Sequence, residues 1–138
     1  MPTFTDTWTA SQWLYATLNV SAVTTLATGG VHVGTVPSDQ TMPYVVARSI
    51  TASDVTEVSA IRIWSAQLWD VIAVGEVWET VDKIAAAVDV LLHKGSGAPS
   101  SGTVHECTRE RPISFDEVDE GVNYIYVGGT YLIKATAV

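Results

Sequence analysis

The sequence predicts an α+β fold: a mostly antiparallel β-sheet of about five strands, packed against one long helix and a short N-terminal helix pair. Several runs are rich in β-branched residues or alternate in polarity, as strands do. One segment repeats its apolar residues at helical spacing. Most connections are too short for β-α-β crossovers, except around the long helix. With 138 residues, 47% of them apolar, residues 1–138 are expected to form a single domain.

The N-terminal part predicts two short helical segments. Residues 9–19 form an amphipathic helix that Thr7 or Thr9 could cap, and Asn19 could cap a second helical turn. Gly29 and Gly30 end it, because glycine tolerates the left-handed conformation found after helices. The apolar side of the first helix carries Trp13, Leu14 and Leu18.

Strands are predicted in two groups, before and after the long helix. The first group comprises 31–36, 44–50, 58–64 and 67–74, with a bend or bulge near Ser65, and the second comprises 103–113 and 123–137. Residues 95–102 are rich in glycine and serine and are expected to be a flexible loop. The acidic segment 116–121 is expected to be a solvated hairpin loop. Gly128 and Gly129 indicate a bulge or a close backbone approach.

The long helix is predicted over residues 76–93. Its apolar residues follow one another at spacings of four, three, four and three, which places them on one stripe facing a core. Glu79 lies four residues before Lys83 on the opposite side, an arrangement that supports a helix modestly. The stripe consists of Val77, Val81, Ile84, Val88 and Leu91.

The charge balance excludes several classes of function. Fifteen acids against seven bases give a formal charge of −8, and no cluster of Lys or Arg occurs. Binding along a nucleic-acid backbone or to an anionic membrane surface requires such a cluster, so neither is expected. The N-terminal residues contain no basic region typical of a secretory signal, and no apolar stretch is long enough to span a membrane. With Cys107 as its one cysteine, the chain can form no internal disulfide, which suits assembly in a reducing cytoplasm.

Only one segment brings a nucleophile, a base and an acid together. In a regular strand, His105 and Cys107 would share one face while Glu106 pointed away, so Glu106 could not orient His105. The histidines and the cysteine lack the short paired spacing of a zinc site. The acids at 116–120 lack the alternating ligands and central glycine of a calcium loop. We therefore expect no enzymatic activity, no cofactor and no metal.

The residues that remain as candidates are those suited to contact between subunits. Tryptophan is enriched at interface hot spots, although Trp64 and Trp69 could equally belong to the core. The acids are expected in loops, where they could contact a neighbouring subunit or line a channel. The candidate set is Trp64, Trp69, Asp54, Glu57, Asp116 and Glu117.

The order of elements resembles a known family. The helix pair leads into LATGGVHV at 26–33, followed by MPYVV at 42–46, a strand LWDVIAV at 68–74 and a helix containing IAAAVDVLL at 84–92, with a final β-hairpin. Over nearly the whole chain this resembles the tail-terminator, or tail-completion, family of siphophages and gene-transfer agents. The chain departs from the family by extra residues between 53 and 65, near the family's arm-like hairpin.

The resemblance implies a structural virion protein, assembled in the host cytoplasm and placed at the head-proximal end of the tail. Its partners would be five further copies in a hexameric ring, the tail tube protein and the head-tail connector or stopper protein. The ring would stop tube polymerisation, and genomic DNA would pass through it without specific binding. An alternative of similar size and acidity is a head-completion or neck adaptor protein of the connector.

Overall fold

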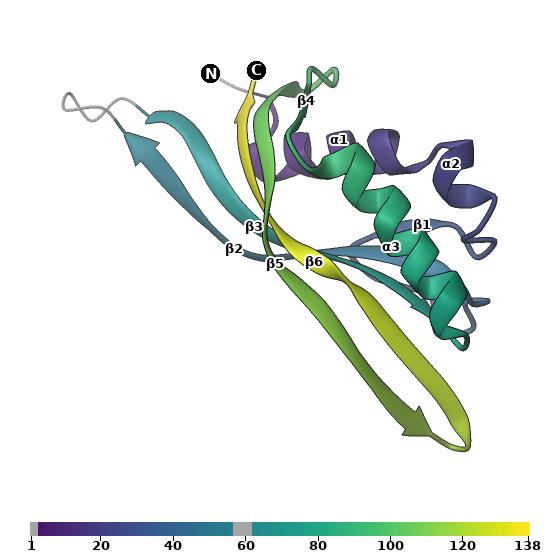
Figure 1. The fold of residues 1–138 in the computed structure, drawn as a ribbon. Coiled ribbons are helices and arrows are strands. Elements are labelled where there is room, and N and C mark those ends of the chain that lie inside the picture. Colours follow the sequence, from purple (N-terminus) through teal and green to yellow (C-terminus); the bar gives the residue numbers. More distant parts are fainter. Residues whose placement is uncertain (1–2, 57–61) are drawn as a thin grey trace.

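A six-stranded mixed sheet dominates the computed structural model, which describes residues 3–56 and 62–138 (Figure 1). The strand order is β1-β2-β3-β6-β5-β4, so the sheet has one strand more than expected. β1 runs parallel to β2, and every other pair is antiparallel. The elements are α1 (Asp6–Leu18), α2 (Ser21–Thr24), β1 (Val31–Val33), β2 (Tyr44–Thr56), β3 (Arg62–Gly75), α3 (Trp78–Leu92), β4 (Gly95–Gly97), β5 (Gly102–Asp119) and β6 (Val122–Ala137).

The N-terminal helix begins earlier than its apolar pattern indicates. Thr5, and not Thr7 or Thr9, is the N-cap: its Oγ1 accepts a hydrogen bond of 3.1 Å from the backbone N–H of Trp8. The carboxylate of Asp6 accepts a hydrogen bond of 2.8 Å from the N–H of Ala137. The start of α1 is thereby joined to the end of β6.

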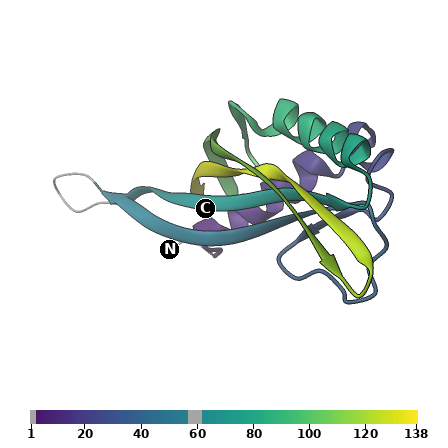
Figure 2. The same cartoon turned by 60° about the horizontal axis from the view of Figure 1, so that its bottom comes forward.

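Both long helices cover the same face of the sheet, and the main core lies between them and that face (Figure 2). In α3, Val81, Ile84, Val88 and Leu92 are at most 2% exposed, whereas Val77 is 59% exposed. The predicted stripe was therefore wrong at Val77, which precedes the start of the helix at Trp78, whereas Leu91 is partly buried and packs against the core. The sheet contributes Ala47, Trp69, Val71, Ile125, Tyr131, Ile133 and Ala135 to this core.

The irregularity expected near Ser65 is a bulge two residues before it. Val55 pairs with Trp64 and Thr56 with Arg62, so Ile63 is an extra residue of β3. From Ser65 to Gly75, β3 pairs with β6 without a register shift, so 62–75 form one strand and not two. A second irregularity lies in β2, between Ser49 and Thr51. The part of the predicted strand at 58–61 lies outside the described residues.

The last two strands form a longer hairpin than expected. β5 continues to Asp119, and the turn consists of Glu120 and Gly121, both with positive φ, as the two-residue turns of hairpins require. Asp116, Glu117 and Asp119 are therefore strand residues, which corrects the predicted acidic loop. β4 occupies part of the predicted loop 95–102 and pairs with β5.

The two glycines in β6 confirm one of the two alternatives, the close backbone approach. A Cβ atom at Gly128 would collide with the backbone oxygen of Val71 on β3, while the β3–β6 register runs through this point without a shift. A side chain at this position would separate the two central strands.

Candidate subunit-contact surface

The face of the sheet opposite α1 and α3, called here the helix-free face, carries a second apolar cluster. Val46, Ile72 and Val74 are buried at its centre. Partly buried apolar and aromatic side chains surround them: Val36, Met42, Tyr44, Ile113, Tyr124 and Tyr126. The segment before β2 contributes Val36 and Met42 to the cover of this cluster, and the partly buried side chains around its centre leave apolar surface of the kind that can mark an interaction site.

The β5–β6 hairpin continues this surface away from the body of the molecule (Figure 1). The Phe115 ring stacks on Tyr126 with centroids 4.5 Å apart, yet Phe115 remains 48% exposed. The hydroxyl of Tyr126 donates a hydrogen bond of 2.6 Å to Glu117. Burial and, after it, this hydrogen bond raise the pKa of Tyr126. Glu117 is thus held on the same side of the hairpin as the aromatic rings.

A row of polar side chains crosses the helix-free face. The buried hydroxyl of Thr130 donates to Asp70 at 2.6 Å and accepts from Nε of Arg111 at 3.2 Å. Arg48 pairs in register with Asp70 on the neighbouring strand. A groove of about 450 Å³ lies beside this row. Strand residues such as Val46, Arg48 and Tyr126 line it, together with residues 34–36 of the segment before β2.

The two tryptophans proposed for contact differ in their surroundings. Trp69 is 3% exposed, belongs to the main core and donates from its indole N–H to Gln67 at 2.9 Å. It is therefore not available to a neighbouring subunit, which corrects its place among the candidates. Trp64 is only partly buried, and Nζ of Lys134 lies 5.6 Å from its ring centroid.

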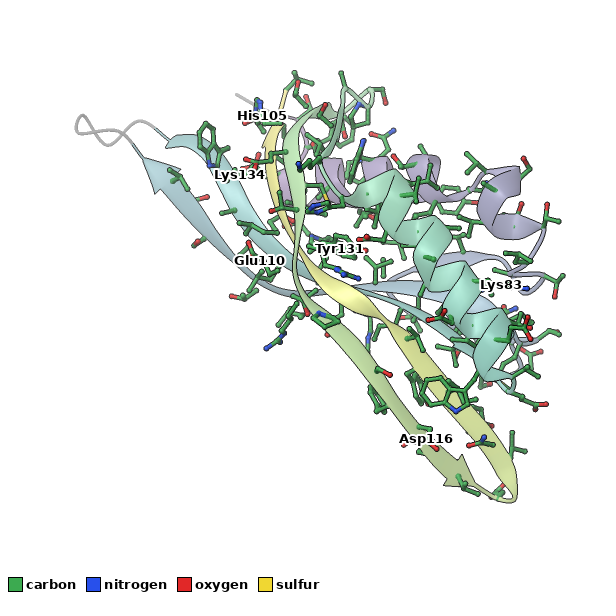
Figure 3. All side chains as sticks on the ribbon, viewed as in Figure 1. Lys83, His105, Glu110, Asp116, Tyr131 and Lys134 are labelled. Carbon is green, nitrogen blue, oxygen red and sulfur yellow. The ribbon has the colours of Figure 1, made fainter. Side chains whose placement is uncertain are left out.

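The acidic candidates are exposed where the structure describes them. Asp54 lies on β2 opposite Ser65, and Asp116 lies on β5 opposite Ile125. Figure 3 shows Asp116 on the outer part of the hairpin, far along β5 from His105. Glu57 lies outside the described residues. Asp54, Asp116 and Glu117 are all strand residues and not loop residues.

The expectation that His105 and Cys107 share a face was wrong. A register shift between Val104 and Glu106 makes His105 an extra residue. His105 hydrogen-bonds to Oγ1 of Thr136 at 2.9 Å, and its ring lies 5.8 Å from Trp64, whereas Cys107 is buried in the main core. The sheet therefore separates the base from the thiol.

The carboxylate of Glu106 and the thiol of Cys107 are also unsuited to nucleophilic chemistry. Glu106 forms an ion pair of 3.1 Å with Lys134. Burial, followed by the nearby charges of Asp89 and Glu106, raises the pKa of Cys107 to about 12. At neutral pH the thiol remains protonated, and only a thiolate attacks efficiently.

A polar link joins α3 to the covered face of the sheet. The Tyr131 hydroxyl, on β6, donates a hydrogen bond of 2.8 Å to Asp89 on α3, and Nε of Arg109 lies 3.7 Å from the same carboxylate oxygen. Burial and this hydrogen bond raise the pKa of Tyr131. The link holds the long helix against the sheet. Among the described residues, no group of three or more His, Cys, Asp or Glu could hold a metal ion, and no helix is long and apolar enough to cross a membrane.

Sequence reasoning missed the aromatic surface of the helix-free face. The sequence does contain a sign of this surface. Tyr44 and Val46 are two residues apart, as are Tyr124 and Tyr126, so each pair lies on one side of its strand. The sequence does not reveal that the helices cover only the opposite side.

Comparisons with known proteins show a likeness in structure but not in sequence. No protein-family model matches the chain, and no curated protein matches it. A chain in the virion of a native gene transfer agent (GTA) particle has a similar structure, with a TM-score of 0.78. The match covers 97% of this chain and 100% of that one, at 13% sequence identity. At this identity the likeness shows that the two chains share a fold.

Proposed function

We propose that this chain is a structural protein of a phage-like particle. The observation that carries the proposal is the end-to-end likeness to a chain of a gene transfer agent virion, because neither chain contains a large segment that the other lacks. The helix-free face supports it, since an apolar surface rimmed by charged side chains suits contact with other proteins. The separation of His105 from the protonated thiol of Cys107 argues against the one enzymatic hypothesis that the sequence offered.

The specific role we propose is that of a tail terminator. Six copies would close into a ring at the head-proximal end of the tail tube, stop its growth and present their other side to the head connector. Six copies at −8 each give a formal charge of −48. An acidic channel would repel DNA phosphates, so the genome could pass without binding. A heterologous contact repeated by rotation closes such a ring without unused contact surfaces.

Deletion of the gene in the particle-producing strain tests this role by electron microscopy of the tails. Loss of a terminator is expected to give overlong tubes, and the wild-type gene supplied in trans should restore their length. Free tails of normal length would instead indicate a neck adaptor. Intact particles with normal tails would contradict a structural role at the head-tail junction.

A further inference from the structure

Two opposite edges of the sheet are left without a partner strand. β1 pairs with β2 only at Val45–Ala47, so residues 48–56 have no described neighbour on that side. At the other side β4 pairs with β5 only at Val104 and Cys107, and the N–H of Arg109 donates to His93. Residues 110–119 of β5 therefore also lack a described neighbour on their outer side. Exposed edges of this length are templates for pairing with another chain.

The charges along these two edges are complementary in one direction only. The free part of β2 begins with Arg48 and carries Asp54 near its end. The free part of β5 has the same order along the chain: Arg111 stands near its start, and Asp116 and Glu117 lie near its end. Antiparallel pairing brings Arg48 to Glu117 on the helix-free side of the two strands, whereas parallel pairing would bring Arg48 towards Arg111 and place like charges together, which is unfavourable.

We propose that the free edge of β2 in one copy pairs antiparallel with the free edge of β5 in the next copy, which continues the sheet from subunit to subunit. This inference rests on the proposed ring. Within a chain β2 and β5 run in opposite directions, because β2, β3, β6 and β5 follow one another antiparallel. Rotation about a ring axis keeps the component of each strand's direction along that axis. In a ring whose strands run mainly along the axis, the β2–β5 contact between copies is therefore antiparallel, as the charges require.

A head-to-tail contact between copies fits these edges better than a twofold contact does. Pairing β2 with β2, or β5 with β5, would use one edge and leave the other exposed. The heterologous contact uses both edges of every copy and sets Phe115 of the hairpin against the neighbour's sheet. We align the two edges so that Arg48 lies opposite Glu117. Ile50 is an extra residue in the pairing of β2 with β3, and we keep it so in the contact. Ala52 then lies opposite Ser114.

Cysteine cross-linking between copies tests the contact. We would introduce Ala52→Cys and Ser114→Cys, two exposed positions, into the same chain, and also separately into two chains. The double variant, oxidised either as purified protein or in tails from cells that produce it, should give a ladder of disulfide-linked multimers. The two single variants should cross-link only when mixed. The wild type, whose Cys107 is buried, and a Ser21→Cys, Ser114→Cys chain should remain monomeric on the gel.

Charge reversal tests the same contact without cysteines. Arg48→Glu and Glu117→Arg are each expected to lower ring yield at least tenfold, and the combined variant should recover most of it. Lys83→Glu is the matched control, because it makes the same charge change on the exposed side of α3.

The outcomes separate this inference from the proposed function. Cross-linked homodimers from either single variant would overturn it in favour of a twofold contact. Rings seen by microscopy in double-variant preparations that give no disulfide ladder would also overturn it, while the terminator role would stand. If deletion of the gene leaves tail length unchanged and the chain forms no multimers, the proposed function fails and this inference fails with it.

Discussion

On the helix-covered face of the sheet, Tyr131 and Ile133 are at most 1% exposed, whereas on the helix-free face Phe115 is 48% exposed. The first face packs against α1 and α3, and its polar groups find partners inside the chain, as Tyr131 does with Asp89. The second face joins a partly exposed aromatic cluster to charged residues on strand edges. The difference teaches that the helices cover the first face completely, whereas the outer part of the second face leaves aromatic surface exposed, which is the surface that the proposed subunit contact would use.

The largest effect on stability is expected from the covered face. Ile84 is fully buried on the sheet-facing side of α3, so Ile84→Ala should lower the free energy of unfolding by about 2–5 kcal/mol through lost packing and a cavity. Val90 lies on the same helix and is 83% exposed, so Val90→Ala should change the free energy of unfolding by less than about 0.5 kcal/mol. Denaturant titration of both variants gives the comparison, and equal losses would contradict the assigned helix phase.

The buried thiol predicts a pH dependence. The pKa of Cys107 is raised to about 12, so its contribution to stability is complete below the ordinary value of 9 and is lost as pH rises towards 12. The free energy of unfolding should therefore fall over this range, and it should fall less in Cys107→Ala. The tyrosines with raised pKa titrate in both proteins, so the difference between the two denaturation series isolates the thiol. Rapid alkylation of the native thiol at pH 8 would show that it is not buried.

Removal of one tyrosine hydroxyl on each face compares what the two faces contribute to stability. Tyr131→Phe removes the buried hydrogen bond to Asp89 and should cost about 1 kcal/mol of unfolding free energy. Tyr126→Phe removes a hydrogen bond to Glu117 in an exposed setting and should cost less than about 0.5 kcal/mol. The reverse order would mean that the helix-free face contributes more to the folded subunit than its exposure indicates.

The smallest effect on the isolated subunit is expected at the hairpin. Phe115→Ser should change the free energy of unfolding by about 0.5 kcal/mol or less, because half of the side chain is already exposed. The same variant should form few multimers when assayed by light scattering. Unchanged assembly would remove Phe115 from the contact surface.

Much of the fold could be predicted from local pattern. The spacing of Val81, Ile84 and Val88 identified α3 and its buried side correctly. Alternation identified β2 and β6, and the Gly128–Gly129 pair was rightly associated with close backbone approach. These features depend on neighbours along the chain or on backbone sterics, which the residue types reveal.

The remaining features depend on pairing between distant segments. The bulge at His105 is defined only by its register against β6, so alternation along the sequence placed His105 and Cys107 on the same face wrongly. The acids after Phe115 have low strand propensity, yet their pairing with Ile125, Tyr124 and Val122 extends the hairpin. Trp69 was a candidate for contact because its residue type alone does not distinguish a core from an interface.

A reconstruction of the assembled particle tests the central claim most directly. The proposed function predicts six-fold density at the head-proximal end of the tail tube, into which six copies of this fold can be placed around an acidic channel. A monomer decorating the outside of the tail, or a ring whose channel is lined by Lys and Arg, would contradict it.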